Sequence, residues 1–185
     1  MQPNAKTFAE TYNKGRAQVL WTDLVADLET PVSALLKLAQ NEICSFLLES
    51  VEGGEKRGRY SILAVKPDLV WRCFGNHAEI ARSDGSKLPT EFEKESSNAL
   101  VSLRNLVIES NIELPDTLPP MASALVGYAG YDMVRLVEKI PDENPDKIGI
   151  PDGMFVRPTV IAVFDSIKDI LTIVTTVFPK EGIDS

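Results

Sequence analysis

Two stretches of the chain carry strand-like apolar runs on both sides of a short turn, and hairpins of this kind constrain the fold most. Residues 68–74 and 78–82 flank a turn at Gly75-Asn76 that also includes His77. Residues 157–178 hold two β-branched runs around a polar turn at 165–169. Because hairpins join antiparallel strands, these pieces predict a largely antiparallel sheet.

Helical segments are expected beside the strands. Thr30 can cap a helix that begins at Pro31, and apolar residues follow at helical spacing. A 3.6-residue period over 89–110, clearest from Ser97 onward, predicts the longest helix, and Asp132 is expected to cap a short one. The sequence therefore predicts an α+β domain whose sheet layers are covered by a few helices, and disfavours a doubly wound parallel sheet.

Length and composition are those of a globular domain with one core. The chain has 185 residues, of which 44% are hydrophobic and 25% are charged. No apolar run reaches the roughly 18 residues needed to cross a bilayer, and the N-terminus lacks the pattern of a secretory signal. We expect a cytoplasmic protein with no membrane partner.

Charge and side-chain chemistry exclude several classes of function. The net charge is −8 and the basic residues are scattered, so no nucleic-acid partner is expected. Cys44 and Cys73 lie in apolar runs without metal-ligand spacing, and we expect small buried hydrophobes and no metal site. The single histidine, His77, falls in a predicted hairpin turn, where structure alone explains it. No catalytic motif is present, so no catalytic residue is expected in this chain.

One polar pair stands at the end of a predicted strand. Residues 43–50 form an apolar run that predicts a buried strand ending in Glu49-Ser50, followed by Gly53 and Gly54. A carboxylate can receive an ammonium group, and a hydroxyl can receive the polar remainder of a small zwitterion such as an amino acid. The alternative is that Glu49 and Ser50 merely solvate the end of the strand.

Two further features allow a structural and a functional reading. The basic side chains of Lys56, Arg57 and Arg59 either form a solvated loop face or bind a carboxylate. The segment “GYAGYDMVR” places glycines before a predicted helix, which is a weak phosphate signal. The better interpretation is that Gly127 and Gly130 permit close packing beside half-buried tyrosines at positions 128 and 131.

Four blocks carry a resemblance to a known family. In chain order they are “TPVSALLKLA”, “FLLESVEGGEKRGRYSILA”, “LVGYAGYDMVRLVEKIP” and “DGMFVRPTVIAVFD”. Together they resemble the N-terminal domain of the anthranilate synthase component I family, in register from about Thr30 to the C-terminus. The resemblance implies that residues 1–185 are an N-terminal regulatory domain.

The resemblance implies an enzyme of tryptophan biosynthesis. Members of the family convert chorismate and ammonia, supplied by a glutamine amidotransferase subunit, into anthranilate and pyruvate. Their chorismate- and Mg²⁺-binding residues lie in a C-terminal catalytic domain that this chain lacks. We therefore expect no lyase activity from this chain alone, and contacts with its own catalytic domain in the complete enzyme.

The resemblance also implies a regulatory site. In the family, the block that contains Leu48, Glu49 and Ser50 forms one wall of the pocket for L-tryptophan, the feedback inhibitor, and Ser50 matches the inhibitor-binding serine. The opposite wall comes from the C-terminal domain. The family's lysine contact is matched neither to Lys56 nor to Arg59.

Two other functions stay open. The large subunit of aminodeoxychorismate synthase, an enzyme of folate synthesis, shares the fold and the chorismate chemistry, but the intact block “LLESVEGGEKRGRYS” favours the tryptophan branch. The second is a non-catalytic binding module, whose apolar or tyrosine-bearing face docks an amidotransferase or another subunit.

Overall fold

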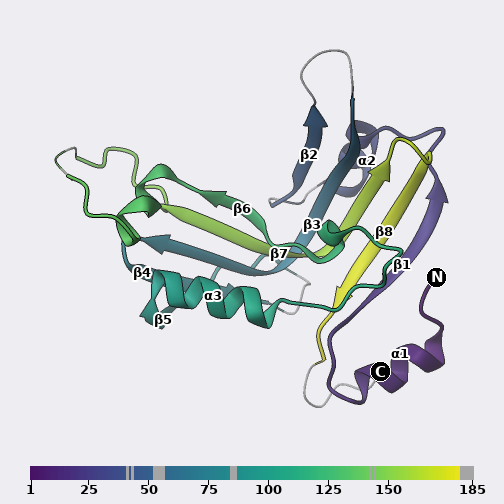
Figure 1. Ribbon diagram of the computed structural model, residues 1–185, viewed down its shortest axis with the longest axis horizontal. Helices are drawn as coiled ribbons and strands as arrows, with labels where there is room; N and C mark the ends of the chain where they lie inside the picture. Colours follow the sequence, from purple (N-terminus) through teal and green to yellow (C-terminus); the bar gives the residue numbers. More distant parts are fainter. Residues whose placement is uncertain are drawn as a thin grey trace. The chain divides into compact units, whose positions relative to one another are not determined.

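The computed structural model describes residues 1–40, 42, 44–51, 57–83, 87–141, 143 and 145–179 (Figure 1). Within them, antiparallel strands alternate with short helices, which confirms the predicted α+β class. The helical elements are α1 (Ala5–Tyr12), α2 (Pro31–Leu38), α3 (Ala99–Glu109) and the 3-10 helices η1 (Pro120–Ser123) and η2 (Tyr131–Leu136). The strands are β1 (Gln18–Val25), β2 (Phe46–Val51), β3 (Arg57–Phe74), β4 (His77–Arg82), β5 (Phe92–Asn98), β6 (Val126–Ala129), β7 (Gly153–Asp165) and β8 (Ile170–Val177).

The chain divides into two compact units, so the predicted single core is wrong. The first unit comprises Met1–Pro67, Ile112–Ala124 and Pro158–Ser185, and the second comprises Asp68–Asn111 and Leu125–Arg157. Strands β3 and β7 each continue from one unit into the other. Apolar spacing along a strand does not reveal where a long strand passes from one core to another, so the sequence could not show this division.

The first unit is built on β1, β8, the second half of β7 and the β2–β3 pair. Strand β1 pairs antiparallel with β8 along its whole length, and β7 pairs with β8 up to Asp165↔Ile170. The predicted hairpin around 165–169 is therefore confirmed. Its last turn residue, Asp169, has a left-handed backbone with φ of 53°, which aspartate adopts more readily than most residues.

Helix α2 begins where the sequence predicts. Thr30 Oγ1 accepts a hydrogen bond from the backbone N–H of Ser33 at 3.0 Å, and Ser33 Oγ accepts one from the N–H of Thr30 at 2.9 Å. This reciprocal capping box satisfies two backbone donors at the start of the helix, and Pro31 suits the first helical position. The helix contributes Ala34 to a core cluster whose other buried members are Leu63, Val65, Ala162, Phe164 and Leu171.

A second core cluster of the first unit holds the segment that includes η1. Its buried members are Val19, Ile112, Leu118, Ala122 and Val174. The N-terminal helix α1 lies beside β1, where Gln18 Nε2 donates a hydrogen bond to the carbonyl of Phe8 at 2.9 Å. Burial of one such aliphatic side chain stabilises a fold by about 1.5–3 kcal/mol, so both clusters contribute substantially.

The second unit contains the remaining strand pairs and α3. Strands β3 and β4 pair antiparallel around the two-residue turn Gly75-Asn76, which confirms that predicted hairpin, and His77 begins β4 opposite Phe74. Strand β5 pairs antiparallel with β4, and β6 pairs antiparallel with β7. The core is formed by Trp71, which is fully buried, together with Leu69, Cys73, Ala78, Ile80, Ala99 and Leu106.

The predicted helix over 89–110 is correct only in its second part. Residues Phe92–Asn98 form β5, and the helix begins at Ala99, where the Asn98 side chain accepts a hydrogen bond from Val101 N–H at 3.0 Å. The strand pairs with β4, and the guanidinium carbon of Arg72 lies 3.6 Å from the centre of the Phe92 ring. Pairing with a neighbouring strand outweighs the weak local preference of the polar sequence FEKESSN.

The segment after β6 also differs from the prediction. A 3-10 helix, η2, stands in place of the short α-helix, and Gly130 precedes it, so Asp132 lies inside the element and does not cap it. The close-packing interpretation of the glycines is confirmed, because a Cβ on Gly127 would lie 2.7 Å from the Phe155 Cα. The tyrosines at 128 and 131 are exposed, by 41% and 83%, so the prediction that they are half-buried is wrong.

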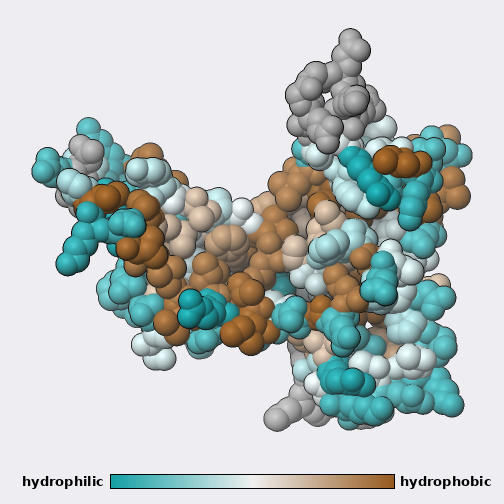
Figure 2. All heavy atoms as spheres, in the orientation of Figure 1, coloured by the Kyte–Doolittle hydropathy of each residue, from teal (hydrophilic) through white to brown (hydrophobic). Residues whose placement is uncertain are grey.

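The surface of the second unit carries exposed apolar side chains. Leu100, Val101, Val107 and Ile108 of α3 are all exposed, and Figure 2 shows apolar side chains over the helix.

The predicted loop at 138–152 contains no helix or strand among its described residues. In the described part of the chain, every helix is too short or too polar to span a bilayer.

Candidate functional site

Strand β2 carries the residues that the sequence singles out. It pairs antiparallel with β3, with Leu48 opposite Ile62 and Glu49 opposite Ser61. Leu48 is 50% exposed, and Glu49 and Ser50 are also exposed. The predicted strand is therefore present, but the prediction that it is buried is wrong. Among the described strands β2 pairs only with β3, so its apolar residues lie at a sheet edge and not between two neighbours.

Alternation along β2 separates the three residues onto two faces. Leu47 pairs with Leu63, which belongs to the core cluster beneath α2, and Glu49 shares that side of the strand. Leu48 and Ser50 therefore point to the other side. A single ligand bound over one face would meet the side chains of Leu48 and Ser50 together, and would reach the Glu49 carboxylate only around the strand edge.

The side chains of Glu49 and Ser50 are both exposed. Among the residues that the structure describes, neither the Ser50 hydroxyl nor the Glu49 carboxylate has a hydrogen-bond or ion-pair partner. The register between β2 and β3 shifts at this point, between Glu49↔Ser61 and Val51↔Arg57. A bulge re-aims the side chains beside it, which is a common feature of strand ends next to binding sites.

Of the basic residues that follow β2, only Arg59 has a described side chain. Gly53, Gly54 and Lys56 lie outside the described residues, as does the side chain of Arg57. Arg59 donates from Nε to Asp165 Oδ1 at 3.1 Å and from Nη2 to Asp165 Oδ2 at 2.8 Å. The guanidinium of Arg59 is therefore already bound by a carboxylate of the chain. Neither of the two interpretations of this side chain, a solvated loop face or a contact with a ligand carboxylate, describes it fully.

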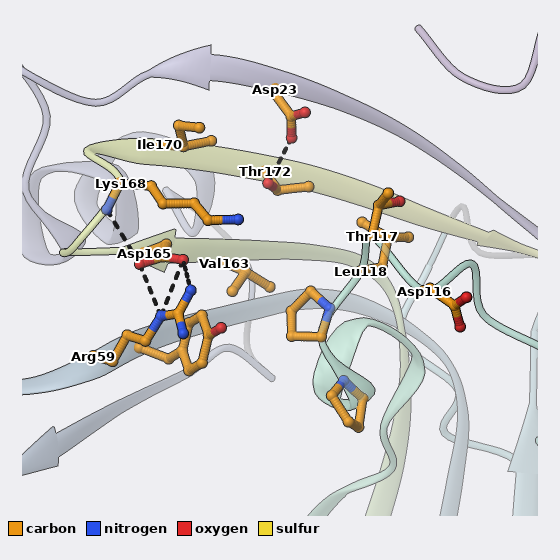
Figure 3. Close-up of a pocket in the computed structure, with 13 residues that line it drawn as sticks. Asp23, Arg59, Asp116, Thr117, Leu118, Val163, Asp165, Lys168, Ile170 and Thr172 are labelled. Carbon is orange, nitrogen blue, oxygen red and sulfur yellow. Dashed lines mark hydrogen bonds and ion pairs between the residues drawn. The ribbon is translucent and has the colours of Figure 1, made fainter.

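This ion pair lies at the edge of a cavity of about 400 Å³ in the first unit (Figure 3). Strands β1 and β8 contribute Asp23 and Thr172, whose side chains hydrogen-bond at 2.6 Å. The Lys168 side chain extends beside the Arg59–Asp165 pair, and its ammonium group has no ion-pair partner in the described part of the chain. Pro119 and Pro120 also line the cavity.

Hydrogen bonds stabilise the ionised form of Asp165. The hydrogen bonds from Arg59 hold the pKa of the Asp165 carboxyl below its usual range, and the backbone N–H groups of Ile167 and Lys168 act in the same direction. Asp165 is therefore ionised throughout the neutral range. Sequence patterns did not single out Asp165 as a site residue, because the one local signal was that it begins a hairpin turn.

The remaining sequence candidates show no catalytic arrangement. His77 is exposed at the start of β4. Cys73 is buried as predicted, whereas Cys44 is only half-buried, and burial raises the pKa of both thiols, which disfavours the reactive thiolate. The described residues contain no group of three or more His, Cys, Asp or Glu side chains placed to hold a metal ion. The resemblance places Mg²⁺ in the catalytic domain, and the described residues of this chain offer no donor set that fits it.

Comparisons with known proteins identify relatives along nearly the whole chain. The chain is 44% identical over 180 residues to anthranilate synthase component 1 of Cereibacter sphaeroides, covering 97% of the chain and 36% of the relative. It is 42% identical over 150 residues to the protein of the same name from Thermus thermophilus, covering 81% of the chain and 30% of the relative. The chain thus spans about a third of the length of the curated relatives it matches.

Two other comparisons add little. No protein-family model matches the chain. A solved structure of anthranilate synthase component I from Streptococcus pneumoniae TIGR4 aligns with a TM-score of 0.48 at 23% identity, covering 88% of this chain and 32% of that one, a likeness too weak to support an inference. The two curated relatives confirm the resemblance seen in the sequence, and the chain belongs to the anthranilate synthase component 1 family.

Proposed function

We propose that this chain is the N-terminal regulatory domain of an anthranilate synthase component 1 in tryptophan biosynthesis. The observation that carries the proposal is 44% identity over 97% of the chain to a protein of that name. The complete enzyme would convert chorismate and ammonia into anthranilate and pyruvate, with ammonia delivered by a glutamine amidotransferase subunit. Chorismate and Mg²⁺ would bind in a C-terminal catalytic domain, so the chain alone is expected to have no lyase activity.

The regulatory part of the proposal concerns L-tryptophan. Leu48 and Ser50 present an apolar side chain and an exposed hydroxyl on the same side of β2, which suits a ligand with an apolar body and a polar backbone. Glu49 adds a carboxylate beside them, at the exposed strand edge. These three residues would form half of the inhibitor site, and the catalytic domain would supply the other half.

Feedback inhibition would follow from differential affinity. If tryptophan binds more tightly to the domain arrangement in which chorismate binds poorly, it shifts the population toward that arrangement. A coupling free energy of about 1–3 kcal/mol is enough to change chorismate affinity roughly 5–150-fold. No catalytic group of this domain needs to move for the inhibition to act.

A docking role for the domain is part of the same proposal. The exposed apolar residues Val107 and Ile108 of α3 and the exposed Tyr131 are the kind of surface that another domain or subunit covers. Contacts with the catalytic domain or the amidotransferase subunit would remove these side chains from water.

One experiment tests the proposal. Product formation from chorismate and ammonia is measured for the complete enzyme with and without L-tryptophan, as wild type, Ser50→Ala and the control Ser96→Ala, which changes an exposed serine of the second unit. We expect anthranilate as product, with inhibition retained by Ser96→Ala and strongly weakened in Ser50→Ala.

Other results would redirect the assignment. An aminodeoxychorismate product would assign the chain to the folate branch, and the absence of any product would support a non-catalytic binding module. Anthranilate formation with unchanged inhibition of Ser50→Ala would keep the enzyme but reject the site. Glu49→Gln is expected to have a smaller effect than Ser50→Ala, because the Glu49 side chain lies on the other face of β2.

A further inference from the structure

The backbone of β3 has an unusual shape opposite Ser50. The pairs Glu49↔Ser61 and Val51↔Arg57 bracket a single residue of β2 but three residues of β3, namely Gly58, Arg59 and Tyr60. Strand β3 therefore carries two more residues than β2 between these pairs. Such a bulge breaks the regular ladder locally and bends the strand.

Gly58 leaves the space that the Ser50 side chain occupies. A Cβ added to Gly58 would lie 2.5 Å from the Ser50 carbonyl oxygen and would overlap both Cβ and Oγ of Ser50. A side chain at position 58 would therefore have to displace the serine or its strand. The observed position of the Ser50 hydroxyl depends on a glycine at this point of the bulge.

Arg59, the middle residue of the bulge, is held at both ends. Its carbonyl oxygen accepts hydrogen bonds from the backbone N–H of Ser166 at 2.9 Å and from Ser166 Oγ at 3.0 Å. Its guanidinium forms the two-pronged contact with Asp165 described above (Figure 3). Asp165 and Ser166, two consecutive residues of the β7–β8 hairpin, thus hydrogen-bond to the side chain and to the main chain of Arg59.

Asp165 is itself held by further backbone contacts. It forms the last residue pair of the hairpin with Ile170, and its Oδ1 also accepts hydrogen bonds from the N–H groups of Ile167 and Lys168 at 3.1 Å and 3.3 Å. A planar guanidinium paired with a carboxylate in this fork geometry defines orientation as well as distance.

We propose that Gly58, Arg59, Asp165 and Ser166 are positioning residues for the ligand site at Ser50, acting through the bulge of β3. The inference rests on the proposed function, and it makes the affinity for L-tryptophan depend on residues that the ligand does not touch. Removing the hydrogen bonds to Arg59 lets the bulge rearrange, so the Ser50 hydroxyl leaves the position in which it binds the ligand. Gly58→Ala acts more directly, by pushing Ser50 away.

The test measures L-tryptophan binding to the complete component 1 protein by titration calorimetry, and inhibition of anthranilate formation with ammonia as nitrogen donor. We expect Gly58→Ala and Arg59→Ala to bind tryptophan about tenfold more weakly or worse, within the range of typical coupling effects. Arg59→Lys, which keeps the charge but loses the fork, is expected to recover part of the affinity. The matched control Arg82→Ala removes an exposed ion pair of the second unit and should leave the affinity unchanged.

The outcomes separate this inference from the site itself. If Ser50→Ala loses tryptophan binding while Gly58→Ala, Arg59→Ala and Asp165→Ala keep it within about twofold, the site stands and the positioning role is rejected. If Ser50→Ala binds tryptophan normally, the proposed site at Ser50 is rejected, and the positioning role falls with it. If a variant does not fold, Ser166→Ala and Arg59→Lys remove fewer hydrogen bonds, and unchanged affinity in both would also overturn the inference.

Discussion

Arg157 donates two parallel hydrogen bonds to the carboxylate of Asp68, although the residues are 89 positions apart. Nε lies 2.9 Å from Oδ1, and Nη2 lies 2.9 Å from Oδ2. The side chains are only 10% and 12% exposed, and both belong to the second unit. A pair this well buried stabilises little in itself, but each charge depends on the other to offset its loss of hydration.

Arg157→Met should therefore destabilise the second unit strongly. The substitution leaves the Asp68 carboxylate without its main partner and is expected to lower the free energy of unfolding by about 3–5 kcal/mol. Arg82→Met, which breaks an ion pair whose side chains are 47% and 43% exposed, should cost less than about 1 kcal/mol. Urea unfolding followed by tryptophan fluorescence measures both, and equal losses would contradict the distinction.

A second prediction concerns the only indole in the core of the second unit's described residues. Trp71 Nε1 donates to Ser102 Oγ at 2.8 Å, and both residues are buried. Ser102→Ala leaves the indole N–H without an acceptor, which should cost about 1–3 kcal/mol. Ser96→Ala, at an exposed serine in the same unit, should change stability by less than about 0.5 kcal/mol. Similar thermal midpoints for the two variants would show that the buried hydrogen bond contributes nothing.

The stability of the second unit should also fall in acid through Glu109. The hydrogen bonds from Arg82 lower the pKa of the Glu109 carboxyl most, and Arg157 adds to the effect. Because the folded pKa lies below the unfolded one, the contribution is complete above the unfolded pKa and is lost as the pH falls through the folded pKa.

The measurement for Glu109 is a comparison of unfolding free energies at neutral pH and between roughly pH 5 and pH 3. The loss on acidification should be smaller in Glu109→Gln, which cannot titrate at this position. The difference should be modest, because the Glu109 side chain is 43% exposed. Parallel pH profiles of wild type and variant would disprove the assignment.

Thr30 provides a test in the first unit. Thr30→Ala removes the side-chain acceptor for the Ser33 N–H and should cost about 0.5–2 kcal/mol by loosening the start of α2. Thr30→Ser keeps a hydroxyl in the same place and should cost much less. Thermal unfolding of the two variants gives the comparison, and equal midpoints would mean that the cap is not needed.

Much of the fold follows from local patterns. The turn at Gly75-Asn76, the hairpin around 165–169 and the start of α2 at Pro31 were all predicted and are confirmed, because turn chemistry and capping depend on a few neighbouring residues. The helix predicted over 89–110 failed in its first part, where β5 pairs with β4. Strand pairing depends on a partner that the local sequence does not specify.

The candidate site shows the same division. Sequence alone determined the family, the strand that carries Glu49 and Ser50, and the antiparallel class of the sheet. These conclusions rest on the hydrophobic period, the turn residues and the sequence blocks of the family, which are all local features of the sequence. Tertiary structure alone decided that this strand is an exposed edge, that the chain forms two compact units, and that Asp165 binds Arg59 from 106 positions away. The physical reason is that exposure and ion pairing between distant residues depend on the order and register of strands, and several orders satisfy the same local pattern of apolar and polar residues.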